Sequence, residues 1–163
     1  MKILGAAVVA GALVIGGSAP ALAAPKSTLG PNGYGAVKLG MTAKKAYATG
    51  KIVLKMKAGE GTCSGWDLKA HPTGKDTVGL YISKKHGVAA IFGWKGMKTP
   101  EGIGIGATLK QIKKAYPKLK TAASGYPYTP VPGNAKAYYS FLLDAKGKVY
   151  ELALGLNAQD CFN

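Results

Sequence analysis

The chain has 163 residues and a formal net charge of +15, from 22 basic residues that are all lysine and 7 acidic residues. This length fits one domain or two small units packed together. The positive field favours an anionic partner, such as an acidic protein or an anionic cell-envelope polymer, or it serves only solubility. The absence of arginine argues against nucleic-acid recognition, because bidentate contacts to bases and phosphates rely on the guanidinium group.

Residues 1–23 have the pattern of a secretory signal peptide. Lys2 precedes the apolar run Ile3–Ile15, and Ala21–Ala23 offers a small-x-small cleavage site. The apolar run is shorter than the ~20 residues that span a bilayer, so we expect cleavage rather than anchoring. The mature protein then begins at Ala24 with a formal charge of 15 − 1 = +14, is secreted, and has no stable membrane insertion.

The start of the mature chain predicts an arm, a helix and a strand. Residues 24–35 are rich in Pro, Gly and Ser and are expected to form a flexible arm. Thr42 is a suitable N-cap for a short helix that ends near Thr49. Lys51–Lys57 alternates apolar residues with lysines, which predicts a strand with a lysine-lined exposed side.

The middle of the chain predicts a loop and a hairpin. Ala58–Lys75 is rich in glycine and is interpreted as a connection. Thr77–Ser83 and Val88–Trp94 have the composition of strands, and the turn between them, Lys84–Gly87, ends on a glycine.

The second half repeats this order. Thr108 followed by Gln111 predicts a capping box that opens a helix, and Pro117 ends the helix at Tyr116. Gly125–Gly133 is a loop stiffened by prolines. A second hairpin is expected from Ala135–Asp144 and Lys148–Leu156.

The two helix starts align when Gly40 is set against Gly106, which also aligns Thr42 with Thr108. The sequence therefore predicts an α+β fold of two similar tandem units, residues 36–98 and 99–163. Each unit would pack a short helical segment on an antiparallel sheet.

The two cysteines, Cys63 and Cys161, predict one disulfide, because an even count in an exported chain favours pairing. The pairing also argues against Cys63 as a thiolate nucleophile, which would need a free thiol beside a base.

No motif predicts a catalytic, cofactor or metal site. The glycines of Gly102–Ala107 resemble a dinucleotide fingerprint, but no parallel strand precedes them and no acidic residue follows about 20 positions on. His71 and His86 lie in predicted loops without convergent metal ligands. We therefore expect a protein that is not an enzyme, although a hydrolase whose residues meet only in the fold stays open.

Aromatic residues near lysines are the candidate partner-binding residues. Rigid aromatic side chains are favoured at interfaces, and lysines steer acidic partners; the alternative is that the tyrosines fill a small core. The candidates are Trp66, Trp94, Tyr126, Tyr128, Lys84, Lys85 and Lys113.

The helix starts carry a family resemblance. Leu39–Thr42 followed by AKKAYATG, and Ile105–Thr108 followed by LKQIKKAYP, resemble the helix starts of small secreted tandem α+β proteins. The similar families are the β-lactamase inhibitory proteins of actinobacteria, which have two such units in tandem, and the single-copy outer-membrane assembly lipoproteins called SmpA or BamE. The resemblance implies a short helical pair packed on an antiparallel sheet.

The sequence departs from the inhibitor family in two respects. That family has a disulfide in each unit and an acidic, aromatic partner surface, whereas this chain has two cysteines and is basic. The resemblance thus implies the fold and not the target. We expect a secreted, non-enzymatic binding or inhibitory module for a protein partner, with a lysine-rich binder of envelope polyanions as the alternative.

Overall fold

The computed structural model describes residues 27–162, so the predicted signal peptide lies outside it. Eight strands form one antiparallel sheet in the order β3-β4-β5-β6-β10-β9-β8-β7, and β1 and β2 form a small separate sheet. The strands are β1 Gly33–Tyr34, β2 Val37–Lys38, β3 Ile52–Met56, β4 Cys63–Leu68, β5 Leu80–Ser83, β6 Gly87–Phe92, β7 Lys120–Thr121, β8 Pro127–Val131, β9 Asn134–Leu143 and β10 Val149–Leu156. The helices are α1 Ala43–Ala48 and α2 Leu109–Ala115.

The expected α+β fold of two helix-on-sheet tandem units is wrong. The two helices have only six and seven residues, and most of the regular structure is strand. One sheet runs without a break through both predicted units, because β6 pairs with β10. Residues from both units also join one hydrophobic core cluster. The protein is therefore a mostly β fold built on a single eight-stranded antiparallel sheet.

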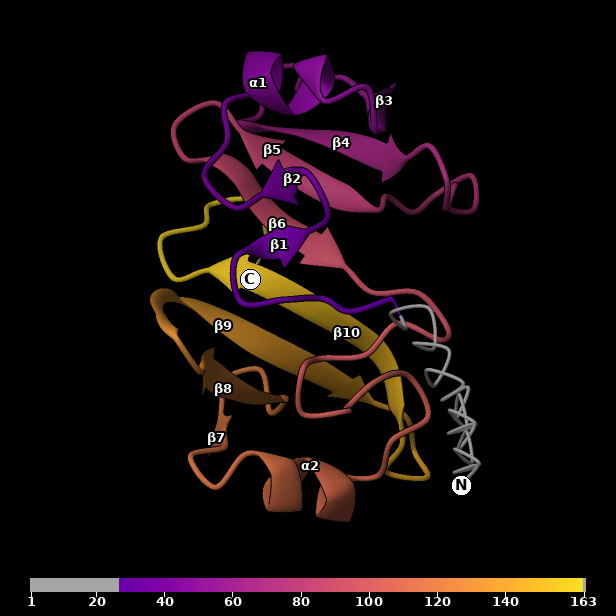
Figure 1. The fold of residues 1–163 in the computed structure, drawn as a ribbon, viewed down its shortest axis with the longest axis vertical. Coiled ribbons are helices and arrows are strands. Elements are labelled where there is room, and N and C mark those ends of the chain that lie inside the picture. Colours follow the sequence, from indigo (N-terminus) through magenta and orange to yellow (C-terminus); the bar gives the residue numbers. More distant parts are fainter. Residues whose placement is uncertain (1–26, 163) are drawn as a thin grey trace, which may run out of the picture.

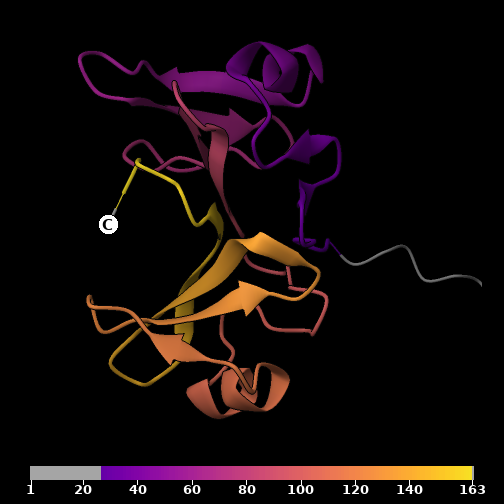
Figure 2. The ribbon, with the colours of Figure 1, turned by 90° about the vertical axis from the view of Figure 1, so that its left-hand side faces the viewer.

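The sheet has a covered face and an open face. Helices α1 and α2 lie at opposite ends of the long axis (Figure 1). The segment with β1 and β2 lies on one side of the sheet, and the chain after β10 lies on the other (Figure 2). The covered face carries the core, whose largest fully buried side chains include Leu80, Ile91, Tyr139, Phe141, Leu152 and Leu154.

Residues 27–32, before β1, are packed against the sheet, which departs from the flexible arm expected for this part of residues 24–35; residues 24–26 lie outside the described residues. Leu29 is fully buried, and its carbonyl accepts a hydrogen bond of 2.7 Å from the hydroxyl of Tyr139. Its amide donates to the carbonyl of Lys98. A buried leucine and a buried tyrosine hydroxyl need this contact, and a composition rich in Pro and Gly does not reveal it.

The predicted helix starts are confirmed. The Thr42 hydroxyl accepts a hydrogen bond from the Lys45 amide at 3.3 Å. Thr108 and Gln111 form the expected capping box, since the Gln111 side chain accepts from the Thr108 amide at 2.8 Å. Within residues 27–162, no helix is long and apolar enough to cross a membrane.

Strand β4 lies in the stretch that was interpreted as a connection, and a buried acid holds it in place. Asp67 is buried in β4 and forms an ion pair of 3.0 Å with Lys55, which was expected on the exposed side of its strand. Asp67 also accepts hydrogen bonds from the amide and hydroxyl of Thr73 and from the amide of Gly79. Lys55 donates in addition to the carbonyls of Thr73 and Gly74. These bonds fasten the loop after β4 to the sheet.

This cluster predicts a loss of stability in acid. Burial by itself raises the pKa of Asp67, but hydrogen bonds from Thr73, Lys55 and Gly79 together outweigh it and lower the pKa. The stabilisation from a lowered pKa is complete above the unfolded value of about 3.9 and disappears as the pH falls through the folded value. At neutral pH, Asp67→Asn should lower the free energy of unfolding by about 1–3 kcal/mol.

Urea denaturation at a series of pH values measures this effect. The difference in unfolding free energy between the wild type and Asp67→Asn should shrink as the pH falls below about 4. A difference that stays constant over that range would show that the ionised carboxylate does not stabilise the fold.

Gly87, at the end of the β5–β6 turn, predicts a second effect on stability. Its φ is +71°, and a Cβ there would lie 2.5 Å from the carbonyl oxygen of Met41 and 2.6 Å from that of Gly40. Gly147 also has a φ of +71°, but a Cβ there would meet nothing within 4 Å. Gly87→Ala should therefore destabilise by about 1–3 kcal/mol more than Gly147→Ala, because the methyl group displaces backbone.

Thermal or urea denaturation of the two variants checks this difference. Both variants carry the same backbone strain, so the comparison isolates the contact between the turn and the segment before α1. Equal losses in the two variants would contradict that contact.

Candidate functional site: an aromatic hollow on the open face

The open face of the sheet contains a hollow of about 680 Å³, which we call the aromatic hollow. Six of its lining residues are aromatic, and the others are small, polar or aliphatic, with a single charged residue, Glu151. No lysine of residues 27–162 lines it, although the chain has 22 basic residues. The aromatic lining residues are Tyr81, Phe92, Tyr126, Tyr128, Tyr138 and Phe162.

The strand register explains why the sheet is hollow here. Phe92 of β6 is opposite Ala153, Ala153 is opposite Ser140, and Ser140 is opposite Tyr128. Directly paired residues point to the same face, so two small side chains lie between two aromatic ones. Three strand spacings separate Phe92 from Tyr128, or about 14 Å. This width suits one or two side chains of a partner.

A second row of paired residues completes the hollow. Tyr81 is opposite Ala90, Ala90 is opposite Gly155, and Gly155 is opposite Tyr138. The ring of Tyr138 lies over Gly155, where a Cβ would come within 2.8 Å of it. Glycine at position 155 therefore leaves room for the Tyr138 ring over β10. The Tyr138 ring also forms a T-shaped contact with the Tyr128 ring, with centroids 6.2 Å apart.

Strand β8 and the loop before it form one rim. The sequence Gly125–Gly133 was interpreted as a loop, but Pro127–Val131 is strand β8, paired with β9 on one side and with the two residues of β7 on the other. Proline is tolerated there because much of the outer side of β8 makes no ladder. The loop between β7 and β8 is closed by a hydrogen bond of 2.9 Å from the Ala122 amide to the Tyr126 carbonyl.

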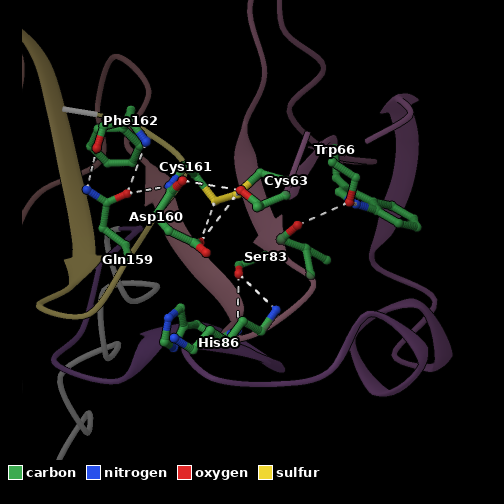
Figure 3. Close-up of a disulfide and its surroundings, with 12 residues drawn as sticks. Cys63, Trp66, Ser83, His86, Gln159, Asp160, Cys161 and Phe162 are labelled. Carbon is green, nitrogen blue, oxygen red and sulfur yellow. Dashed lines mark hydrogen bonds between the residues drawn. A yellow bond between two sulfur atoms is a disulfide. The ribbon is translucent and has the colours of Figure 1, made fainter. Parts of the chain in front are cut away.

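The C-terminal segment forms the opposite rim, and the disulfide holds it (Figure 3). Cys63 and Cys161 are bonded, with their Cα atoms 5.5 Å apart, which confirms the predicted pairing. The side chain of Gln159 accepts hydrogen bonds from the amides of Cys161 and Phe162 and donates to the carbonyl of Phe162. The ring of Phe162 thereby lies against Tyr81 and Phe92, at centroid distances of 6.1 and 5.8 Å.

Within residues 27–162, one cluster of possible metal-ligand atoms is found, and it includes both cysteines of the disulfide. Ligand atoms of Cys63, Asp160 and Cys161 lie within 4.8 Å of one another. Both sulfurs are held in the disulfide, and a thiolate is the form that binds metal. The oxidised protein therefore offers only the Asp160 carboxylate at this point.

Burial shifts the pKa of two groups in the hollow. It raises the pKa of Glu151. It also raises the pKa of Tyr138, an effect that a hydrogen bond with Gln159 partly offsets. Both shifts favour the neutral form of the group, as expected for a site with reduced access to water.

The structure brings together only some of the predicted binding residues. Tyr126 and Tyr128 line the hollow. Trp66 is 9% exposed, belongs to the core on the covered face, and donates from its indole to Ser64 at 2.8 Å. Trp94 packs against the core and stacks on His71 at a centroid distance of 3.6 Å. Neither tryptophan lines the hollow, because Trp66 belongs to the hydrophobic core and Trp94 packs against it.

The predicted steering lysines are exposed but lie apart. Lys84 and Lys85 are in the β5–β6 turn, where the Ser83 hydroxyl accepts from the amides of Lys85 and His86 (Figure 3). Lys113 is on α2, beyond the other half of the sheet. They therefore contribute to the general positive field rather than to one patch.

The sequence interpretation missed Tyr81, Phe92, Glu151 and Phe162. A period-2 signal was present for Tyr81, as it was for Tyr138. Tyr81 lies between Leu80 and Ile82, and Tyr138 lies between two buried residues, so each points to the face opposite the core. Aromatic residues on the outer face of several neighbouring strands are a usable signal once the strand order is known.

Comparisons with known proteins add a similarity of fold. No protein-family model matches the chain, and no curated protein matches it. A crystal structure of the uncharacterized protein yfeY from Escherichia coli is similar, with a TM-score of 0.51 and 16% sequence identity. The similarity covers 79% of this chain and 99% of that chain. At this level of identity it shows the fold alone.

Removal of the disulfide should destabilise the protein and change the hollow. The bond joins residues 98 positions apart, so the double variant Cys63→Ser/Cys161→Ser should lose about 4–5 kcal/mol in unfolding free energy on the chain-entropy model. Phe162 should also leave its ring cluster, because the disulfide anchors its segment. Urea denaturation measures the first effect, and the NMR shifts of the Tyr81 and Phe92 rings measure the second.

Wild-type protein treated with a reductant serves as a control and should match the double variant. Unchanged stability together with unchanged ring shifts would show that the Gln159 hydrogen bonds alone hold the segment.

Proposed function

We propose that this protein is an exported, non-enzymatic binding or inhibitory module that holds a protein partner in the aromatic hollow. The observation that carries the proposal is an uncovered sheet face with six aromatic side chains around small central residues. Exposed, rigid aromatic side chains gathered around a depression are typical of the anchor points of protein interfaces.

The rigidity of the hollow supports binding. Its walls are on strands β5, β6, β8 and β9, and its C-terminal rim is held by the disulfide and by Gln159. Little conformational entropy is then lost when a partner docks. The disulfide fits an extracellular or periplasmic location, which is where we expect the partner.

The lysines suit an acidic partner. Net charge steers encounter over distances up to about the Debye length of 8–10 Å. The only ion pair within residues 27–162 is Lys55–Asp67, so the remaining lysines there are available for this role. The hollow would then fix the position of a partner that the lysines attract.

A second candidate function is binding of an envelope polyanion by helix α2. Lys110, Lys113 and Lys114 are exposed on this seven-residue helix. Such binding would rest on lysine charge alone, would need no hollow, and would fall steeply with salt.

Capture from culture fluid with matched variants tests the proposed function. The immobilised wild type should retain a protein partner, and Tyr126→Ala/Tyr128→Ala should lose it, because both rings line the hollow. Truncation of anchor residues commonly weakens binding by about 2 kcal/mol or more, which is roughly thirtyfold. Tyr47→Ala is the control, since Tyr47 is 62% exposed on α1, outside the hollow.

Salt separates the two candidate functions. Capture through the hollow should persist in about 1 M salt, where the Debye length is about 3 Å. Retention of a partner that survives Tyr126→Ala/Tyr128→Ala, but is lost in high salt or on replacing the three α2 lysines by glutamine, would support polyanion binding and contradict binding in the hollow.

A further inference from the structure

The charge of the aromatic hollow is opposite to that of the whole protein. Glu151 is the single charged side chain among its lining residues, whereas the chain as a whole has a formal charge of +15. Every basic residue is a lysine, and none of those in the described part of the chain lines the hollow. The hollow is thus an acidic and aromatic site on a basic protein.

The Glu151 carboxylate has no hydrogen-bond or ion-pair partner among the described residues. It lies on the open face of β10, opposite Leu142 of β9, and it is only partly exposed. Within residues 27–162, no hydrogen bond or ion pair to this carboxylate is formed; the one ion pair there is Lys55–Asp67. A half-buried carboxylate without a partner is unfavourable, since burial removes part of its hydration. A ligand that brought a positive charge would relieve that penalty.

The surrounding rings favour the same kind of ligand. Phe92 is opposite Ala153, two residues along β10 from Glu151, and Tyr128 lies across Ser140 in the same row. The faces of aromatic rings carry negative potential and attract an ammonium or guanidinium group within about 6 Å. A carboxylate beside several rings is the arrangement by which proteins hold organic cations.

We propose that the aromatic hollow binds a lysine or arginine side chain of the protein partner, with Glu151 pairing its charge and the rings of Phe92, Tyr128 and Tyr138 contacting its stem. This inference rests on the proposed function and names the chemistry that the partner must present. The general positive field attracts an acidic partner, and the hollow accepts only a partner with a basic side chain at the point of contact. Specificity for the partner then comes from the negative charge of Glu151, which is opposite in sign to the positive field of the whole protein.

The test uses two small probes and the full mature protein. Nα-acetyl-lysine methylamide carries the cation, and Nα-acetyl-norleucine methylamide is its neutral counterpart. Titration followed by ¹H–¹⁵N NMR should shift the amides near Phe92, Tyr138 and Glu151 with the lysine probe, at millimolar concentration. The neutral probe should bind about tenfold more weakly or not at all, because it lacks the charge-assisted contact.

A matched pair of variants tests whether Glu151 is the group that pairs with the cation of the lysine probe. Glu151→Gln should weaken the lysine probe about tenfold, whereas Glu60→Gln, which changes net charge equally at an exposed loop position, should not. The remaining NMR shifts of Glu151→Gln report that the fold is intact. Equal binding of the two probes, or unchanged lysine binding in Glu151→Gln, would overturn the inference and identify an apolar site instead.

Failure of the cation inference can be distinguished from failure of the proposed function. If partner capture is lost in Tyr126→Ala/Tyr128→Ala but kept in Glu151→Gln, the hollow binds a partner through apolar contacts and the cation inference fails. If the lysine probe binds through Glu151 but no partner depends on the two tyrosines, the cation site stands and the proposed function fails.

Discussion

The pairing of β6 with β10 is the constraint on which the rest of the structure depends. Only three residue pairs make this junction, Ala153 with Phe92, Leu154 with Ile91 and Gly155 with Ala90, yet it makes a single sheet from two sets of four strands. Leu154 and Ile91 are fully buried on the covered face. Small residues dominate the other side of the same junction. One set of pairs therefore builds the core on one face and leaves room for the aromatic hollow on the other.

The open face becomes a site because large side chains surround that small-residue centre and are held there. Phe92 and Tyr81 lie on one side, Tyr128 and Tyr138 on the other. The disulfide acts at a distance from the junction but completes the same feature, since it brings Phe162 onto Tyr81 and Phe92. The Cys63–Cys161 disulfide thus contributes both to the stability of the fold and to the shape of the hollow.

Local sequence signals predicted local structure well, and long-range structure poorly. The threonine caps, the two hairpins and the disulfide followed from residue types and spacing. Strand β4 was missed because Asp67 breaks the apolar pattern. Asp67 can be buried because Lys55 and Thr73, 12 and 6 residues away in sequence, satisfy its carboxylate. Strand β8 was missed because of its prolines, and the fold class was wrong because the sequence does not show that β6 and β10 pair. Tyr126 and Tyr128 were found by composition, whereas Tyr81 and Glu151 became candidates only through the register.

Site-specific photo-cross-linking tests whether the open face is where a partner is held. A benzophenone side chain would replace Tyr138, which lines the hollow, or Tyr47, which is exposed on α1. We expect illumination in culture fluid to cross-link a partner protein to the benzophenone at position 138 and none to the benzophenone at position 47. Cross-links that form from position 47 and not from position 138 would show that the partner binds elsewhere and would contradict the account.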